Sequence, residues 1–127
     1  MIPRYRAYDG GSLCRMYSPE EVMVGNGDIW IIDEDDVAGE WIVNNDLDLM
    51  QSTGLTDKNG KEIFEGDVVK MAKNVYSEPT YYEVVRHRGG AYRLKSKQYG
   101  CELWLRHTDC EIAGNIYENP ELLEVSS

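Results

Sequence analysis

Residues 55–71 read LTDKNGKEIFEGDVVKM and are the most informative stretch of the chain about its architecture. Asp57-Lys58-Asn59-Gly60 carries a tight-turn signal, because Asn and Gly tolerate the positive φ that such a turn requires. Glu65-Gly66-Asp67 predicts a second reversal, before a strand over residues 68–71. Two reversals so close together are typical of small barrels, in which the strands are short and bent.

The glycines and aspartates of this region are best explained by a structural role in turns. We expect Gly54, Gly60 and Gly66 at three chain reversals, where a missing Cβ relieves steric strain. Asp57 and Asp67 are expected to accept backbone N–H hydrogen bonds in the turns that they flank. The alternative interpretation is a polar rim that touches a partner, made of Asp57, Lys58, Asn59, Lys61, Glu62, Glu65 and Asp67.

The clearest hairpin spans residues 81–95, with Gly89-Gly90 at its turn. Alternation leaves neither face purely apolar, because it places Tyr82, Val84, Arg86 and Arg88 on one side and Tyr81, Glu83, Val85 and His87 on the other. A sheet that is exposed to solvent on one side fits this pattern.

Short runs rich in Tyr, Val, Ile and Trp, some of them alternating with a period of two, predict strands elsewhere in the chain. They cover residues 2–8, 13–17, 29–32, 40–43, 102–106 and 111–113, and the first two form a hairpin. Short helical turns are predicted at 18–21 and 119–123, where Ser18 or Asn119 precedes a proline. The first of these turns is expected to end at Gly25-Asn26-Gly27-Asp28, because glycine disfavours helix.

The charge of the chain is negative and unevenly spread. Its 127 residues carry 13 Lys plus Arg and 23 Asp plus Glu, a net charge of −10. Residues 1–50 hold 3 basic and 11 acidic side chains, whereas residues 73–107 hold 7 basic and 3 acidic ones. This balance excludes a general polyanion binder, and no apolar run approaches the about 20 residues of a membrane span.

The cysteine pattern gives no support for a metal site. Three cysteines, an odd number, and no secretory segment after Met1 lead us to expect a cytoplasmic protein with free thiols. Cys101, His107 and Cys110 do not have a standard zinc-ligand spacing, and the acidic run 33–36 lacks the alternating oxygen ligands of a calcium loop. We expect no metal and no cofactor.

Catalytic signatures are also missing from the sequence. There is no G-x-S-x-G motif and no glycine-rich phosphate loop, and pairs of carboxylates are expected by chance in so acidic a chain. The sequence therefore predicts a protein that is not an enzyme.

A basic, aromatic stretch within residues 73–107 is the strongest candidate for binding a partner. Its members are Tyr81, Tyr82, Arg86, Arg88, Tyr92, Arg93, Lys95, Trp104 and Arg106. Flat rings between cations suit a protein interface, and they also suit single-stranded nucleic acid, whose bases stack on rings while its phosphates pair with arginine. The negative charge of the whole chain favours the protein partner.

Three blocks of the sequence resemble the YopX family of phage and prophage proteins. They are Arg4-Tyr5-Arg6-Ala7-Tyr8-Asp9, the block 50–69 and the block 114–123, which reads GNIYENPELL. The resemblance implies a mostly β fold, a small SH3-like barrel in the C-terminal part and a tendency to self-associate. It provides no catalytic residues, because no activity is established for the family.

Together these observations predict a mainly β protein of short-stranded sheets with little helix. We expect an N-terminal β subdomain (1–50) and a C-terminal SH3-like barrel subdomain (51–127). The expected function is that of a non-enzymatic, phage- or prophage-derived interaction module, which forms homo-oligomers and binds a host or phage protein without contacting a membrane. The alternative is a binder of single-stranded nucleic acid that uses residues 73–107.

Overall fold

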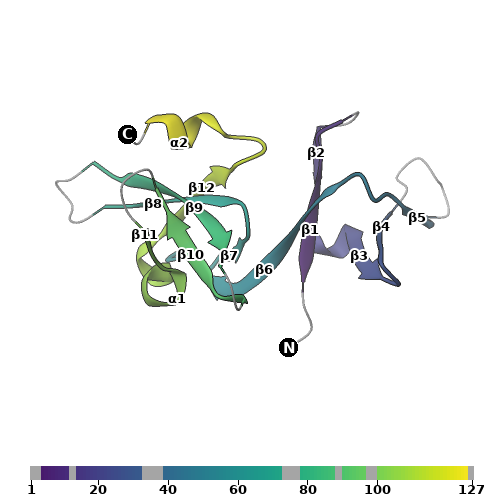
Figure 1. Ribbon diagram of the computed structural model, residues 1–127, viewed down its shortest axis with the longest axis horizontal. Coiled ribbons are helices and arrows are strands. Elements are labelled where there is room, and N and C mark those ends of the chain that lie inside the picture. The colour runs from purple at the N-terminus through teal and green to yellow at the C-terminus, as the bar shows by residue number, and fades with distance from the viewer. Residues whose placement is uncertain are drawn as a thin grey trace. The chain divides into compact units, whose positions relative to one another are not determined.

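A computed structural model of the protein describes residues 4–11, 14–32, 39–72, 78–87, 90–96 and 100–125. These residues form mostly strands, and helix is confined to short segments (Figure 1). The prediction of a mainly β protein with little helix is therefore confirmed. The chain divides into two compact units, Met1–Ser52 and Thr53–Ser127.

A four-stranded sheet has the order β2-β1-β6-β7. Its strands are β1 (Tyr5–Asp9), β2 (Arg15–Tyr17), β6 (Asp48–Thr56) and β7 (Glu62–Phe64). β1 pairs antiparallel with β2, as the predicted N-terminal hairpin requires, and antiparallel with β6. β6 runs across the division between the two units, because Ser52 and Thr53 are consecutive residues within it.

A three-stranded antiparallel sheet lies within the N-terminal unit. It has the order β3-β4-β5, with β3 (Val22–Gly25), β4 (Asp28–Ile32) and β5 (Trp41–Val43). The predicted helical turn before it is a 3-10 turn, Pro19–Glu21. The strand β3 was not predicted. Asn26 and Gly27, with φ of 54° and 80°, link β3 to β4 as a two-residue turn instead of only ending a helix.

A five-stranded antiparallel sheet forms the C-terminal unit, in the order β11-β10-β9-β8-β12. Its strands are β8 (Asp67–Met71), β9 (Thr80–Arg86), β10 (Tyr92–Lys95), β11 (Gly100–Glu102) and β12 (Glu111–Asn115). One of its faces packs into a core made of Ile63, Val69, Tyr82, Val84, Leu94, Leu103 and Cys110. The predicted pairing of the 81–95 hairpin is present as β9 and β10, although its turn residues 88 and 89 lie outside the described part of the chain.

The predicted C-terminal SH3-like barrel is wrong. A barrel closes when its first and last strands pair, but in the described residues β11 and β12 lie at opposite edges of the five-stranded sheet. β7, which follows the turn at residues 57–60, pairs in the other sheet, next to β6. The half-barrel is therefore the N-terminal sheet β2-β1-β6-β7.

The predicted strand over residues 102–106 is also wrong from Leu103 onward, where the chain forms the helix α1 (Leu103–Arg106). A single helical turn buries Leu103 completely and leaves Trp104 and Leu105 exposed, a distribution that an alternating strand would not give. The C-terminal helical turn is present as α2 (Glu121–Val125).

The turn chemistry predicted for residues 57–67 is confirmed, but the reversal predicted at Gly54 is wrong, because Gly54 lies within strand β6, where its φ is 77°. Asp57 Oδ1 accepts the backbone N–H groups of Asn59 and Lys61, both at 2.9 Å. Asp67 Oδ2 accepts the N–H of Phe64 at 2.7 Å, and Gly66 adopts a φ of 87° that favours glycine. Both carboxylates are buried, so Asp57 and Asp67 do not belong to an exposed polar rim.

Candidate interaction surfaces

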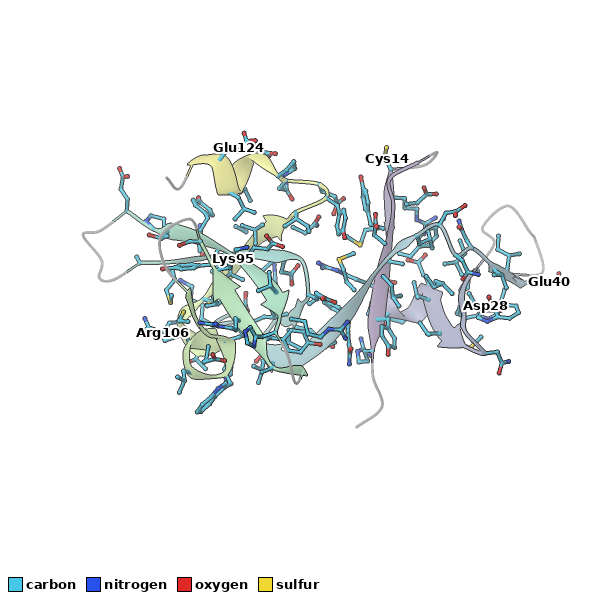
Figure 2. All side chains as sticks on the ribbon, in the orientation of Figure 1. Cys14, Asp28, Glu40, Lys95, Arg106 and Glu124 are labelled. Atoms are coloured by element: carbon cyan, nitrogen blue, oxygen red, sulfur yellow. The ribbon has the colours of Figure 1, made fainter. Side chains whose placement is uncertain are left out.

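The basic, aromatic stretch does not form one surface. Tyr82 is buried in the core of the C-terminal unit, and Tyr92 packs against that core. Arg93 and Lys95 follow the alternation to the opposite face of β10, because Leu94 between them points into the core. Figure 2 shows Lys95 on the sheet and Arg106 on α1. Arg88 lies outside the described residues.

Carboxylates accompany the arginines of this stretch. Arg93 Nε lies 3.4 Å from Glu102 Oε1, Arg106 Nε lies 3.3 Å from Asp109 Oδ2, and Arg86 Nε lies 3.9 Å from Glu65 Oε2. Across the sheet, the register places Lys95 directly opposite Glu83. Arg86, Arg93 and Arg106 thus each have a carboxylate beside them.

The helix α1 presents the most exposed hydrophobic side chains of the C-terminal unit. Trp104 is 63% exposed and Leu105 is 58% exposed. Arg106 is anchored at the end of this turn, since its Nη2 lies 3.5 Å from Met71 Sδ while its Nε faces Asp109. Of the nine predicted binding residues, Trp104 is the one with a largely exposed aromatic ring.

The three-stranded sheet carries a second apolar surface, made of residues that the sequence analysis does not single out. Residues opposite each other in an antiparallel pair share a face, and the register places Met23, Trp30 and Val43 in one such row and Ile32 with Trp41 in another. These two rows lie on the same side of the sheet. We call it the apolar face, defined by Met23, Trp30, Ile32, Trp41 and Val43.

The opposite side of the sheet contributes two residues to the core of the N-terminal unit. Val22 and Ile31 point to that other side and are buried in the core of the N-terminal unit, together with Ala7, Tyr17 and Leu47. On the apolar face, Met23 is 47% exposed and Val43 is 43% exposed. The sheet is therefore hydrophobic on both sides, and its core-facing side is only partly covered, because Val24 and Ile42 on that side are also exposed.

Local hydrogen bonds hold this sheet in shape. The indole Nε1 of Trp30 donates to the Gly25 carbonyl at 3.3 Å, across the β3–β4 pair. Asn45, which follows β5, holds the start of β4, because its Nδ2 donates to Asp28 Oδ1 and its Oδ1 accepts the N–H of Ile29, both at 2.8 Å. The Asn26-Gly27 pair between two apolar runs is the sequence signal that identifies this hairpin.

The segment of sequence that carries the apolar face is acidic. Residues 22–43 contain six acidic side chains and no Lys, Arg or His. Asp28 belongs to β4 and Glu40 comes immediately before β5, as Figure 2 shows. The acidic run 33–36 lies outside the described residues, and it connects these two strands in the sequence.

The residues considered for zinc have other roles. The Cys110 thiol donates to the Arg106 carbonyl oxygen at 3.2 Å, and His107 Nδ1 lies 2.8 Å from the Thr56 carbonyl oxygen. Burial, together with the neighbouring Cys101 and Asp109, raises the pKa of the Cys110 thiol to about 11. In the described part of the chain no group of His, Cys, Asp and Glu side chains is arranged to hold a metal ion.

None of the described helices has the length and apolar character needed to cross a membrane.

Comparison with known proteins gives a consistent result. The family model described as YopX protein matches residues 4–124. The crystal structure of protein EF1440 from Enterococcus faecalis is similar with a TM-score of 0.64 and 27% identity, over 97% of this chain and 99% of that one. Protein yopX from Bacillus subtilis matches with a TM-score of 0.65 and 21% identity, over 94% and 97% of the two chains, which shows a shared fold. No curated protein matches the chain.

Proposed function

The chain belongs to the YopX family, and from this starting point we propose that it is a non-enzymatic, phage- or prophage-derived module that binds another protein and associates with its own copies. The observation that carries the proposal is the apolar face of the β3-β4-β5 sheet. Met23, Trp41 and Val43 are exposed on this face, and Trp30 and Ile32 beside them are half-buried. An exposed apolar surface of this kind is typical of a site that a partner covers.

The chemistry of the described residues supports binding over catalysis. A nucleophilic cysteine needs a lowered pKa, whereas burial raises the pKa of both Cys101 and Cys110. Asp57 is occupied by three backbone N–H groups, those of Asn59, Lys61 and Ile112. A carboxylate held in this way stabilises turns and is poorly placed to exchange protons with a substrate.

Self-association is supported by the uneven charge. Residues 1–50 carry a net charge of −8, whereas residues 73–107 carry +4. Opposite charges on two copies of the chain attract, and this attraction weakens as salt rises. Light scattering across protein concentration and salt tests it, and a strict monomer throughout would remove this part of the proposal.

Binding to another protein is tested by affinity purification of the tagged full chain from a native lysate. We expect a protein that is retained by the wild type and by Leu105→Ser but lost from Val43→Ser. Both changed residues are exposed, so both variants should fold, and only the second alters the apolar face. A partner that is retained equally by all three proteins would contradict the assignment of the apolar face.

A further inference from the structure

Within the described part of the chain, strand β5 forms an edge of the three-stranded sheet that carries little of the usual protection against association. β5 lies at one side of the sheet in the described residues, and Trp41, Ile42 and Val43 are all exposed. Natural edge strands are commonly protected by a charged side chain, a proline or a covering segment. β5 contains no charge and no proline, which makes it suited to being covered by a partner.

Charge decides which partner is suitable. The segment that carries the apolar face, residues 22–43, has six acidic side chains and no basic one. Asp28 and Glu40 are the two of these that the structure describes, so a second copy docked through the same face would bring like charges together, and an anionic membrane would also be repelled. A basic partner gains from the same field, both in its rate of encounter and in its affinity.

The aromatic rings add a second preference for cations. The indole N–H of Trp30 already donates to the Gly25 carbonyl, so a partner would contact the carbon atoms of the ring. Trp41 is 38% exposed and shares the face. Lys and Arg side chains bind over tryptophan rings through cation–π attraction, most strongly where water is excluded.

We propose that the apolar face of β3-β4-β5 is a docking surface for a basic protein segment in which Lys or Arg side chains accompany large apolar ones. The apolar side chains of the segment cover Met23, Trp41 and Val43, and its cations meet the rings and the carboxylates of Asp28 and Glu40. This inference rests on the proposed function as an interaction module, and it adds the chemistry of the partner.

Three matched peptides test the chemistry. The first combines Lys with Leu, the second replaces each Lys with Glu, and the third replaces each Leu with Ser. The protein is the full chain carrying Trp104→Phe, so that its fluorescence reports on Trp30 and Trp41 alone. We expect saturable binding of the Lys–Leu peptide, with binding of each of the other two weaker by about tenfold or more.

Matched variants then locate the binding site, with anisotropy of a labelled peptide as the readout. Val43→Ser should lower the affinity for the Lys–Leu peptide by about tenfold, whereas Leu105→Ser on α1 should leave this affinity unchanged. Glu40→Lys should lower the affinity for the Lys–Leu peptide and raise the affinity for the Glu–Leu peptide. Glu40 is exposed, so this charge reversal reports on the partner's chemistry and not on folding.

Other outcomes overturn the inference in distinguishable ways. Equal affinity for the Lys–Leu and Glu–Leu peptides would show that charge plays no part. A dimer that Val43→Ser dissociates, or a fluorescence shift of Trp30 and Trp41 on phosphatidylcholine vesicles, would assign the face to a second copy or to lipid. If no peptide binds, but the wild type retains a lysate protein that Val43→Ser does not, the inference fails and the proposed function stands. If Val43→Ser retains that lysate protein as well, both fail.

Discussion

Asp57 Oδ2 accepts the backbone N–H of Ile112 at 3.0 Å, so one carboxylate links the turn after β6 to strand β12, 55 residues further along the chain. The other oxygen of the same carboxylate holds the turn itself through Asn59 and Lys61. A buried group with three hydrogen bonds connects local turn geometry to the packing of the C-terminal unit.

Replacing Asp57 with Asn should therefore destabilise the protein. The variant keeps one acceptor oxygen but turns an amide donor toward a backbone N–H, which costs about 1–3 kcal/mol of unfolding free energy. Chemical denaturation checks the size of the effect. Asn59→Ala keeps the backbone N–H that Asp57 uses and serves as the matched control, so equal losses for the two variants would contradict the role given to the carboxylate.

The stabilisation by Asp57 should also depend on pH. Burial raises the pKa of this carboxyl, but the N–H groups of Ile112, Lys61 and Asn59 outweigh burial and hold the pKa below its usual value. A carboxyl with a lowered folded-state pKa stabilises the protein fully above its unfolded pKa, and this stabilisation is lost as pH falls through the folded pKa. The stability gap between wild type and Asp57→Asn should thus be largest near neutral pH and shrink below the ordinary aspartate range. Denaturation curves across acidic pH check this, and a gap that widens in acid would contradict it.

Gly114→Ala should destabilise the protein because there is no room for a side chain. A Cβ at this position would lie 2.4 Å from Asn119 Oδ1 and 2.9 Å from Asn119 Cβ. The required shift costs about 1–3 kcal/mol, measurable by thermal unfolding. Gly100→Ala is the matched control, since a Cβ there meets its nearest atom at 3.5 Å. Removing the Asn119 side chain in the double variant Gly114→Ala/Asn119→Gly should restore part of the lost stability. If the double variant is no more stable than Gly114→Ala, the clash is not the cause.

The three cysteines should differ in their reactivity toward a thiol reagent. Cys14 is exposed, while Cys110 is buried and its pKa is raised to about 11, so Cys110 has very little thiolate at neutral pH. We expect iodoacetamide to modify Cys14 first and Cys110 only after unfolding. Mass spectrometry of timed digests measures the order, and early modification of Cys110 in the folded protein would contradict its burial.

Binding of single-stranded nucleic acid by residues 73–107 is the alternative that the sequence leaves open. The ion pairs of this stretch lead us to expect that an oligonucleotide does not bind. Arg93 and Arg106 already face Glu102 and Asp109. We expect no saturable binding of a labelled oligonucleotide even at low ionic strength, where phosphate contacts are strongest. Tight binding that Trp104→Ala abolishes would instead favour the nucleic-acid alternative.

The sequence predicted the turns better than the surfaces. Asp57, Gly60 and Asp67 sit in turns whose chemistry depends on neighbours only a few residues away, so a single sequence contains what is needed. The four residues of α1 form a short apolar run that is typical of a strand, and the burial of Leu103 in a core assembled from distant strands cannot be predicted from the run itself.

The apolar face was missed for a similar reason. Met23 and Val43 are twenty residues apart in the sequence, and they share a face only through the register of β4 with its two neighbours. The Asn26-Gly27 turn was a usable signal, but it was interpreted as the end of a helical turn. The basic stretch looked continuous in the sequence because alternation hides which of its rings lie inside the core, as Tyr82 does.

Strand β6 has a practical consequence for experiments that dissect the protein. Cutting between Ser52 and Thr53 would sever one continuous strand and leave each fragment with half of it. Because residues 48–51 of β6 pair with β1, that pairing would stay within the first fragment, so this position is the natural first choice for testing whether each unit folds by itself.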